Sequence, residues 1–289
     1  MVNSLYNEAL SSLESGGIED ASFEADVLFE EVFGRDFKLM LLTGQLDRKE
    51  TEAEAASIRT MLQRRLSGEP LQYIVGRWDF YRGEFSVGEG VLIPRQDTET
   101  LVDSAYMLVK DIPSPKILDL CSGTGCIAIT LSELLQDSEV HAIEFYDDAY
   151  TYLERNISEH NSRVIPHKLD ALDESSAGQF TGFDLITCNP PYLTSEDMLE
   201  LQTEVTYEPE SALYGGTDGL DFYRTIPIIW KSSLNPGGYI AFEIGATQGE
   251  AVRSILESAG YSGVTVIKDL CEKDRTVIAK NFLKSHFAY

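Results

Sequence analysis

The sequence predicts an α/β protein in which a small helical domain precedes a doubly wound sheet. From residue 116 onward, short apolar runs alternate with helical patterns, as strands and helices do in such a sheet. The first 75 residues show helical patterns only. A length of 289 residues with 43% hydrophobic content is enough for one full α/β domain and a smaller one. We therefore expect a helical domain at 1–75, a β-hairpin linker at 76–95 and a sheet domain at 96–289.

The helical domain is predicted from apolar residues spaced for one face of a helix. These residues are Phe23, Val27 and Leu28 in one helix and Ile58, Leu62 and Leu66 in another. Either Asp47 or Thr51 is placed to cap the second of these helices, because both side chains accept hydrogen bonds from backbone N–H groups.

The linker is predicted from an alternating aromatic segment at residues 78–87, which Gly83 interrupts and Gly88 closes. We expect its aromatic side chains to pack against their neighbours, with contact to a substrate groove as the secondary alternative. These side chains are Trp78, Phe80, Tyr81 and Phe85. Arg95, which follows the hairpin, either faces the active site or forms an ordinary surface ion pair, and both alternatives stay open.

Seven strands are predicted in the sheet domain. They lie near 116–121, 139–144, 163–168, 183–188, 238–244, 264–268 and 275–280. Ligands in such sheets bind outside the carboxyl ends of the strands. Four residues that attract attention on chemical grounds, Gly125, Glu144, Asp170 and Asn189, all lie just past a predicted strand end. The sequence therefore predicts one binding rim.

A small-residue turn at Cys121–Gly125 joins the first of these strands to a helical run, which is a nucleotide-cofactor arrangement. Ala128 stands in the place of the third glycine of the dinucleotide fingerprint, so the spacing alone leaves NAD open. Asp119, at the strand end, suits a cationic sulfonium amino acid better than a pyrophosphate. Glu144 ends the next strand, where a carboxylate accepts both ribose hydroxyls; a solvated acid is the plainer alternative.

The run Asn189-Pro190-Pro191-Tyr192 follows an apolar strand and is typical of methyl transfer to an amide or amino nitrogen. A carboxamide NH2 has two donors and needs two acceptors. The side-chain oxygen of Asn189 and the main-chain carbonyl of Pro190 could supply them, because prolines restrict the direction of the chain. Tyr192 could then cover the planar group. A simple turn is the alternative for this tetrapeptide.

Taken together, the motifs resemble the release-factor glutamine methyltransferase family, class I enzymes that methylate the glutamine side chain of a Gly-Gly-Gln motif. The likeness extends nearly from end to end. Besides the two motifs above, it is carried by 68–74 (GEPLQYI), 93–99 (IPRQDTE), 207–213 (YEPESAL), Gly219-Leu220 and Glu243-Ile244-Gly245.

The resemblance implies a class I methyltransferase domain with an antiparallel edge hairpin formed by its last two strands, and S-adenosyl-L-methionine as cofactor. The expected cofactor-binding residues are Asp119, Cys121, Ser122, Gly123, Thr124, Gly125, Glu144, Asp170, Ala171 and Asn189. The expected substrate-binding residues are Asn189, Pro190, Pro191 and Tyr192, of which Asn189, Pro190 and Tyr192 are expected to be catalytic. Cys121 departs from the family's usual glycine, and Ala171 departs from its usual bulky side chain.

The resemblance also implies that the partners are peptide chain release factors, which the helical domain would recognise. A nearby variant would modify glutamine in a ribosomal protein instead. The net charge of −25 and pI near 4.4 would repel a phosphate backbone. A nucleic-acid adenine methyltransferase, which would use a similar clamp on a flipped base, is therefore the less favoured alternative. A third alternative is a non-catalytic module that kept the fold without its cofactor.

The sequence shows no sign of a metal site, a membrane span or a signal peptide. The four cysteines and four histidines show no metal-ligand spacing, so we expect no metal and a reducing compartment. No stretch reaches the roughly 18 apolar residues of a membrane span, and no signal peptide is recognisable. We therefore expect a cytoplasmic protein without a membrane partner.

Overall fold

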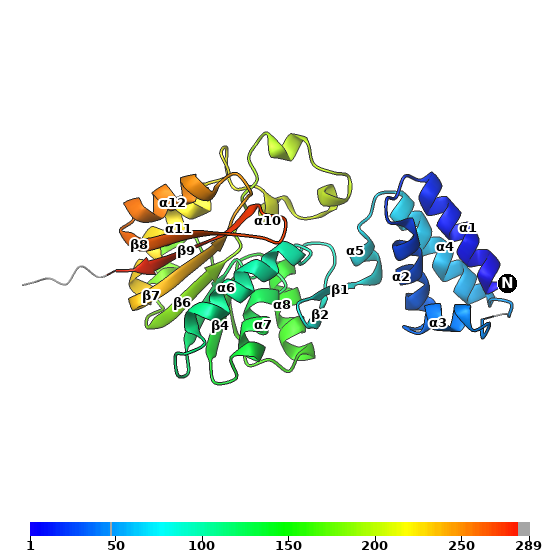
Figure 1. Cartoon of the computed structure of the whole chain (residues 1–289), viewed down its shortest axis with the longest axis horizontal. Coiled ribbons are helices and arrows are strands. Elements are labelled where there is room, and N and C mark those ends of the chain that lie inside the picture. The colour runs from blue at the N-terminus through cyan, green and yellow to red at the C-terminus, as the bar shows by residue number, and fades with distance from the viewer. Residues whose placement is uncertain (47, 283–289) are drawn as a thin grey trace, which may run out of the picture. The chain divides into compact units, whose positions relative to one another are not determined.

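The computed structural model describes residues 1–46 and 48–282, and the chain divides into two compact units (Figure 1). The first unit comprises Met1–Gly76 together with Gln202–Tyr207, and the second comprises Arg77–Leu201 together with the chain from Glu208 onward. The chain thus leaves the second unit between Leu201 and Glu208 to contribute a short segment to the first.

The first unit is helical, as predicted. Its elements are α1 (Val2–Ser15), α2 (Ala21–Phe33), α3 (Phe37–Leu42), α4 (Glu52–Leu66), α5 (Leu71–Val75) and the 3-10 helix η3 (Glu204–Tyr207). The face predicted for α2 is wrong in one member, because Phe23 is 54% exposed. Leu28 is buried as predicted and Val27 is partly buried, while Ala25 and Phe29 are buried in place of Phe23. The apolar pattern of α2 missed Ala25 because alanine contributes little to such a pattern. Its small side chain nevertheless lets neighbouring helices approach closely, so it belongs to the buried face.

Thr51 caps α4 in a capping box. Its hydroxyl accepts a hydrogen bond from the backbone N–H of Glu54 (3.2 Å), and the Glu54 carboxylate accepts one from the backbone N–H of Thr51 (2.7 Å). Two otherwise unpaired donors at the start of the helix are satisfied in this way. Asp47, the alternative cap, lies outside the described residues.

A buried arginine ties the segment at 202–207 to the helices of the first unit. Arg65, near the end of α4, is only 5% exposed and pairs with Glu24 (2.6 Å) and Glu204 (2.9 Å). The hydroxyl of Tyr207 also donates to the carbonyl of Ser67 (3.1 Å). Removing one partner of a buried ion pair leaves an uncompensated charge, so these contacts strongly favour the observed placement of the segment.

The second unit contains a seven-stranded sheet in the order β5-β4-β3-β6-β7-β9-β8. Its strands are β3 (Lys116–Leu120), β4 (Glu139–Glu144), β5 (Ile165–Lys168), β6 (Phe183–Cys188), β7 (Leu234–Glu243), β8 (Tyr261–Lys268) and β9 (Asp274–Asn281). The pairs from β5 to β7 are parallel, whereas β9 is antiparallel to both β7 and β8. The predicted doubly wound, mostly parallel sheet with an antiparallel edge hairpin is therefore confirmed.

Two strands begin several residues earlier than predicted, β7 at Leu234 instead of 238 and β8 at Tyr261 instead of 264. The difference is largest for β7. Pro236 and Gly237 (φ +83°) stand in this stretch, and the pairing with β6 shifts register between Phe183 and Leu185. Proline and glycine are poor strand residues, so the alternation of apolar and polar residues does not predict a strand that begins with them.

Helices cover both faces of the sheet. They are α6 (Glu99–Val109), α7 (Cys126–Leu134), α8 (Asp147–Glu159), α9 (Glu174–Ala177), α10 (Glu210–Leu213), α11 (Asp221–Ile229) and α12 (Gly249–Ser258), with the 3-10 helices η1 (Gln96–Thr98), η2 (Asp197–Leu199) and η4 (Lys231–Ser233). Apolar residues of α11 and α12 pack on one face, and those of α6, α7 and α8 on the other (Figure 1). No helix within the described ranges is long and apolar enough to cross a membrane.

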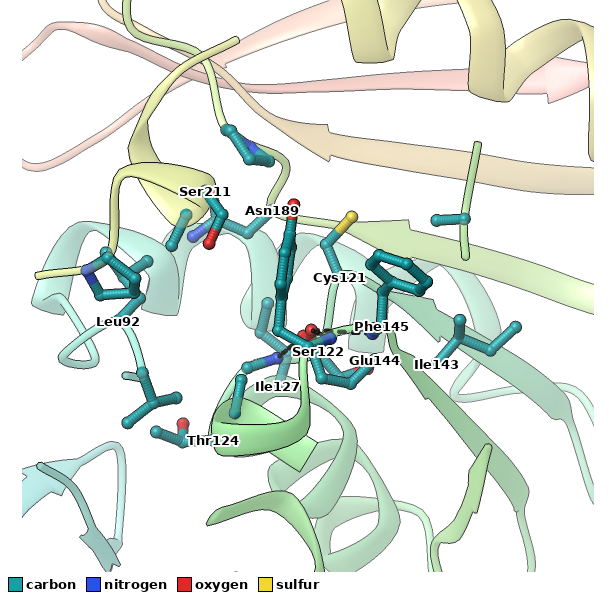
Figure 2. Close-up of a pocket in the computed structure, with 18 of the residues that line it drawn as sticks. Leu92, Cys121, Ser122, Thr124, Ile127, Ile143, Glu144, Phe145, Asn189 and Ser211 are labelled. Carbon is teal, nitrogen blue, oxygen red and sulfur yellow. Dashed lines mark hydrogen bonds between the residues drawn. The ribbon is translucent and has the colours of Figure 1, made fainter. Parts of the chain in front are cut away.

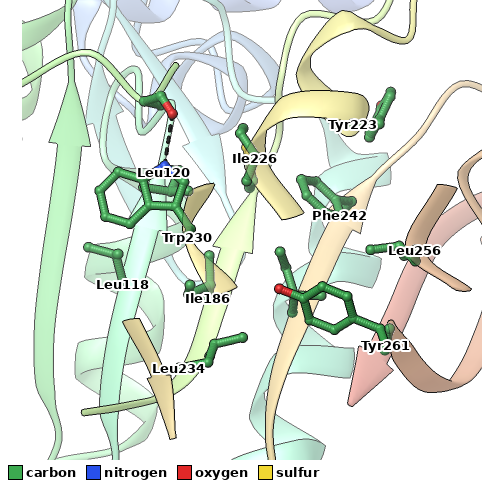
Figure 3. Packing of buried hydrophobic residues seen from close by; sticks show 14 of the residues in the cluster. Leu118, Leu120, Ile186, Tyr223, Ile226, Trp230, Leu234, Phe242, Leu256 and Tyr261 are labelled. Atoms are coloured by element: carbon green, nitrogen blue, oxygen red, sulfur yellow. Dashed lines mark hydrogen bonds between the residues drawn. The ribbon is translucent and has the colours of Figure 1, made fainter. Parts of the chain in front are cut away.

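Trp230 is the largest fully buried side chain of the first of these two clusters. Its indole N–H donates to the main-chain carbonyl of Ala171 (2.8 Å) while the ring packs among apolar residues (Figure 3). A buried indole needs such a partner, and the bond fixes the loop after β5. Residues of that loop reach the cavity described below.

The hairpin is formed by β1 (Arg77–Phe80) and β2 (Gly83–Ser86). Phe80 and Phe85 are buried, meet edge to face at 6.0 Å and join the cluster formed with α6 and α7. These two side chains therefore pack against their neighbours, which was the favoured expectation.

Two histidines meet between β4 and β5. Nδ1 of His141 and Nε2 of His167 are 2.8 Å apart, and Nε2 of His141 lies 2.8 Å from a carboxylate oxygen of Glu139. Burial, and the charge of His141, lower the pKa of His167.

We expect His167 to lower the free energy of unfolding as the pH falls below its ordinary pKa of 6.5. The pKa of His167 is lower in the folded protein than in the unfolded chain, so the unfolded chain binds more protons in this range. The stabilising contribution is present above pH 6.5 and is lost as the pH falls through the folded pKa. Urea unfolding of the wild type and His167→Asn at a series of pH values measures it. The substitution should flatten the dependence, and an unchanged slope would contradict this assignment.

Candidate active site

A cavity of about 170 Å³ lies at the carboxyl ends of β3, β4 and β6 (Figure 2). Its floor is built from the turn after β3, the end of β4 and the loop after β6. Its walls come from residues 90–95, residues 169–172 and residues 209–212. All of these segments belong to the second unit. The rim predicted from the strand ends is thus where the structure has its cavity.

The turn Cys121–Gly125 runs in the left-handed region at three positions. The φ angles are +58° at Cys121, +52° at Gly123 and +81° at Gly125. Only glycine adopts such angles without steric cost, so the cysteine carries a strain of about 1–2 kcal/mol. This conformation gives a physical reason why a glycine is usual at position 121.

The two glycines of the turn serve different purposes. A Cβ on Gly123 would meet only a methyl of Val91 at 3.9 Å, so it would project into the cavity. A Cβ on Gly125 would lie 2.5 Å from a methyl of Leu153. Gly123 therefore keeps space open for a ligand, whereas Gly125, which does not line the cavity, lets α7 begin close against α8.

Glu144 joins the turn to the end of β4. Its carboxylate accepts hydrogen bonds from the backbone N–H groups of Gly123 (2.9 Å), Phe145 (2.8 Å) and Tyr146 (2.9 Å), as Figure 2 shows. Burial raises the pKa of this carboxyl, while the three N–H groups act in the opposite direction. The side chain lines the cavity and has lone pairs for further donors.

Asp119 lies beneath the turn, outside the cavity lining. It is fully buried, and one of its oxygens accepts a hydrogen bond from the hydroxyl of Thr187 (2.7 Å). Within the described part of the chain, its other oxygen, Oδ2, has no hydrogen-bond partner. Burial raises the pKa of Asp119 to about 7. A buried oxygen of this kind is costly unless a donor reaches it.

Asn189 follows β6 directly and lines the cavity together with Pro191. Its side-chain nitrogen, Nδ2, donates a long hydrogen bond of 3.4 Å to the hydroxyl oxygen of Thr98. Pro190 and Tyr192 do not line the cavity. Tyr192 instead packs against the core, and burial raises its pKa to about 12, so its hydroxyl stays protonated.

The backbone that follows Asn189 is held from behind by two glycines. A Cβ on Gly215 would lie 2.6 Å from the carbonyl oxygen of Pro191, and one on Gly219 would lie 2.2 Å from that of Tyr192. The side-chain amide of Gln248 also donates to the carbonyl of Tyr192 (3.0 Å). The segment Asn189–Tyr192, called the clamp below, is therefore fixed by direct backbone packing, which needs glycine.

One wall of the cavity is held by an ion pair. Arg95 lines the cavity and pairs with Glu208, which also accepts a hydrogen bond from the backbone N–H of Ile93 (3.0 Å). Glu208 is only 6% exposed, and burial raises its pKa. The two alternatives for Arg95 are thus combined, because it faces the cavity and also forms an ion pair, although with a buried partner.

Several lining residues escaped the sequence analysis. Val91, Leu92 and Leu172 give no chemical signal in the sequence. Phe145 and Tyr146 are about half exposed at the cavity, and an aromatic pair directly after a strand-end acid could have been noticed. The predicted Ser122, Thr124, Asp170 and Ala171 all line it.

Two protein-family models match the chain. These are the PrmC N-terminal domain at residues 4–76 and the methyltransferase small domain at residues 98–214. A release factor glutamine methyltransferase from Clostridium botulinum is 36% identical, covering 98% of this chain and 100% of the relative. One from Geobacter sulfurreducens is 37% identical, covering 92% and 91%. This chain belongs to the release factor glutamine methyltransferase family.

Solved structures agree on the fold. The hMettl16 catalytic domain, crystallised with a MAT2A 3'UTR hairpin, aligns with a TM-score of 0.55 at 14% identity, covering 83% of this chain and 87% of that one. At this identity the likeness concerns architecture alone, and it confirms the class I methyltransferase fold of this family member.

The cofactor of this methyltransferase is S-adenosylmethionine, and the cavity fits it. Gly123 leaves space that a side chain would fill, and Glu144 offers a carboxylate at the floor. Phe145 and Tyr146 supply aromatic surface for a flat base. Within the described residues, no three His, Cys, Asp or Glu side chains are grouped to hold a metal ion.

We expect Gly123→Val to reduce the affinity for S-adenosylmethionine by at least about tenfold, a loss of about 1.4 kcal/mol. The added side chain would enter the cavity at a φ of +52°. Calorimetric titration measures the effect. Gly263→Val is the matched control, because Gly263 has a φ of +60° and a Cβ added there would meet nothing within 4 Å. Native affinity in Gly123→Val would contradict the role of the turn.

We expect Gly219→Ala to lower turnover by at least about tenfold, since a displacement of about 1 Å at a reacting group has this effect or more. The new methyl group would have to push the Tyr192 carbonyl away from its position 2.2 Å distant. Affinity for the cofactor should change little. Gly237→Ala is the control, because Gly237 has a similar φ of +83° and meets only the flexible side chain of Lys280 at 3.5 Å. Equal turnover in both variants would show that the clamp is not held in this way.

Proposed function

We propose that this protein transfers a methyl group from S-adenosylmethionine to the side-chain nitrogen of the glutamine in the Gly-Gly-Gln motif of peptide chain release factors. The family and the names of its relatives support this proposal. The observation that carries it is the orientation of Asn189. Because Nδ2 of this residue donates to Thr98, its oxygen is the end available to a donor in the cavity.

The chemistry requires such an acceptor. S-adenosylmethionine supplies an electrophilic methyl group on a positively charged sulfur. A carboxamide nitrogen delocalises its lone pair into the carbonyl, so it is a weak nucleophile unless its surroundings orient and polarise it. The Asn189 oxygen and the main-chain carbonyl of Pro190 would accept the two hydrogens of the amide and stabilise positive charge that develops on its nitrogen. As the nitrogen takes the methyl group, the bond from that methyl group to sulfur would break. One of the two N–H protons would then leave to water, so that a neutral methylated amide remains.

Positioning is the main contribution we assign to this protein. Holding two reacting groups in line contributes up to about 7–11 kcal/mol in favourable cases. The two prolines fix the direction of the clamp, and Gly215 and Gly219 press against it from behind. The catalytic roles of Asn189, Pro190 and Tyr192 belong to this proposal; Tyr192 would act through its packing beside the clamp.

A protein substrate agrees better with the charge of this chain than a nucleic acid does. A net charge of −25 opposes the approach of a phosphate backbone. We assign recognition of the release factor to the helical region at 1–75 and a linking role to the hairpin region at 76–95. The proposed site of action is the cytoplasm, where release factors work, with no membrane partner.

We expect one methyl group on the Gly-Gly-Gln glutamine when a release factor is incubated with this protein and S-adenosylmethionine, as read by mass spectrometry of peptides. Asn189→Ala should lower the rate by about a hundredfold or more, as loss of an electrostatic partner does at other active sites, while calorimetry shows cofactor affinity close to wild type. A DNA and an RNA oligonucleotide serve as competing acceptors. Methylation of adenine in either one, with an unmodified release factor, would replace this proposal by a nucleic-acid activity.

A further inference from the structure

Three polar side chains of the second unit form a line that ends at the cavity. Asn189 is the residue after β6, Glu243 is the last residue of β7, and Thr98 is the last residue of η1. Strands β6 and β7 are parallel neighbours, with Cys188 opposite Phe242. The next residues, Asn189 just after β6 and Glu243 at the end of β7, therefore lie side by side.

The hydroxyl of Thr98 lies between the other two side chains. Its oxygen accepts the hydrogen bond from Nδ2 of Asn189 at 3.4 Å, and the hydroxyl is also hydrogen-bonded to the Glu243 carboxyl. Thr98 is 2% exposed and Glu243 is 1% exposed. Asn189 is partly exposed and lines the cavity, which Thr98 also lines, whereas Glu243 does not.

The hydrogen bonds along this line run in one direction, from Asn189 to Thr98 and from Thr98 to Glu243. An ionised carboxylate only accepts hydrogen bonds, whereas a hydroxyl can donate one and accept two. An ionised Glu243 can only accept the hydroxyl hydrogen, and Thr98 then offers only lone pairs to Asn189. Burial raises the pKa of Glu243 to about 7, so this order holds above that pH. Asn189 must then turn its NH2 group toward Thr98 and its oxygen the other way. The two ends of a carboxamide have nearly the same shape, so sterics alone would not select between them.

We infer that Glu243 and Thr98 are positioning residues that select the orientation of the Asn189 amide, so that its oxygen faces the substrate. The inference rests on the proposed transfer to a glutamine amide. In the opposite orientation, Asn189 would present two donors to the NH2 group of that substrate, and donor would face donor. Neither Glu243 nor Thr98 needs to touch the substrate for this effect.

A purely structural role would leave the position of the carboxyl unexplained. Glu243 lies in the interior, and within the described residues its second oxygen, Oε2, has no hydrogen-bond partner. The nearest arginine charges are already paired, Arg275 with Asp97 (2.9 Å) and Arg95 with Glu208. A buried carboxyl that is only partly satisfied costs stability, and an apolar residue would fill the same space without that cost.

The test compares Thr98→Val, which keeps the shape and removes the hydroxyl, with Thr98→Ser, which keeps the hydroxyl. With a release factor as acceptor, Thr98→Val should lower kcat by about tenfold or more, the loss expected for one hydrogen bond. The KM for the acceptor and the affinity for S-adenosylmethionine should stay near wild type. Thr98→Ser should retain most of the activity. Glu243→Gln should give an intermediate loss, because a glutamine side chain can either accept from the hydroxyl or donate to it.

A second readout does not depend on the acceptor. In protein labelled with ¹⁵N, the side-chain NH2 signal of Asn189, identified by its loss in Asn189→Ala, should exchange slowly with water and exchange faster in Thr98→Val and Glu243→Gln. Unchanged exchange in both variants, or a Thr98→Val kcat within about twofold of wild type, would overturn the inference. If the wild type does not methylate a release factor but its Asn189 side-chain NH2 exchanges slowly with water, only the proposed function is contradicted. If Thr98→Val does not fold, the Glu243→Gln and Thr98→Ser results decide.

Discussion

The parallel register of β3, β4, β6 and β7 is the constraint on which the site depends. Because these strands pair side by side and run in one direction, the residues at their carboxyl ends meet at one edge. Asp119, Glu144, Asn189 and Glu243 lie at or just beyond these ends. Three of the four are carboxyls, and burial raises the pKa of each one. The sheet therefore holds acceptors where solvent cannot compete for their donors.

Backbone packing then fixes the segment that follows this edge, to which the proposed function assigns the clamp. The chain at Pro191 and Tyr192 touches Gly215 and Gly219 so closely that even a methyl group would collide. Backbone contacts of this kind are stiffer than contacts between side chains, which can change rotamer. The proposed methyl transfer depends on the alignment of the reacting groups more than on acid or base strength. A rigid backbone behind the hydrogen-bond acceptors is therefore as useful as the acceptors themselves. The requirement explains why glycines far along the chain from Asn189 belong to the same site.

The fold was largely predictable from the sequence because apolar strands, small-residue turns and strand-end acids are local patterns. The cofactor turn and Asn189 could be found for the same reason. The contacts of Thr98 and Gln248 could not, since each residue is hydrogen-bonded to one dozens of positions away. Thr98 drew attention only as part of the segment 93–99 that carries the resemblance, and Gln248 gave no signal. The buried face of α2 was misjudged because alanines that permit close packing contribute little to an apolar pattern. Roles that arise from three-dimensional proximity need the structure.

The chain after the clamp links the two units through its own covalent path. It starts at Tyr192, contributes Gln202–Tyr207 to the helical unit, and returns to form a cavity wall at residues 209–212. At its far point Glu204 pairs with the buried Arg65, and on its return Glu208 pairs with Arg95. Each unit thus holds this segment by an ion pair that has one buried member, Arg65 in the first unit and Glu208 in the second. We propose that the helical unit binds the substrate. The segment Gln202–Tyr207, which belongs to that unit, is continuous along the chain with the clamp before it and with the cavity wall after it.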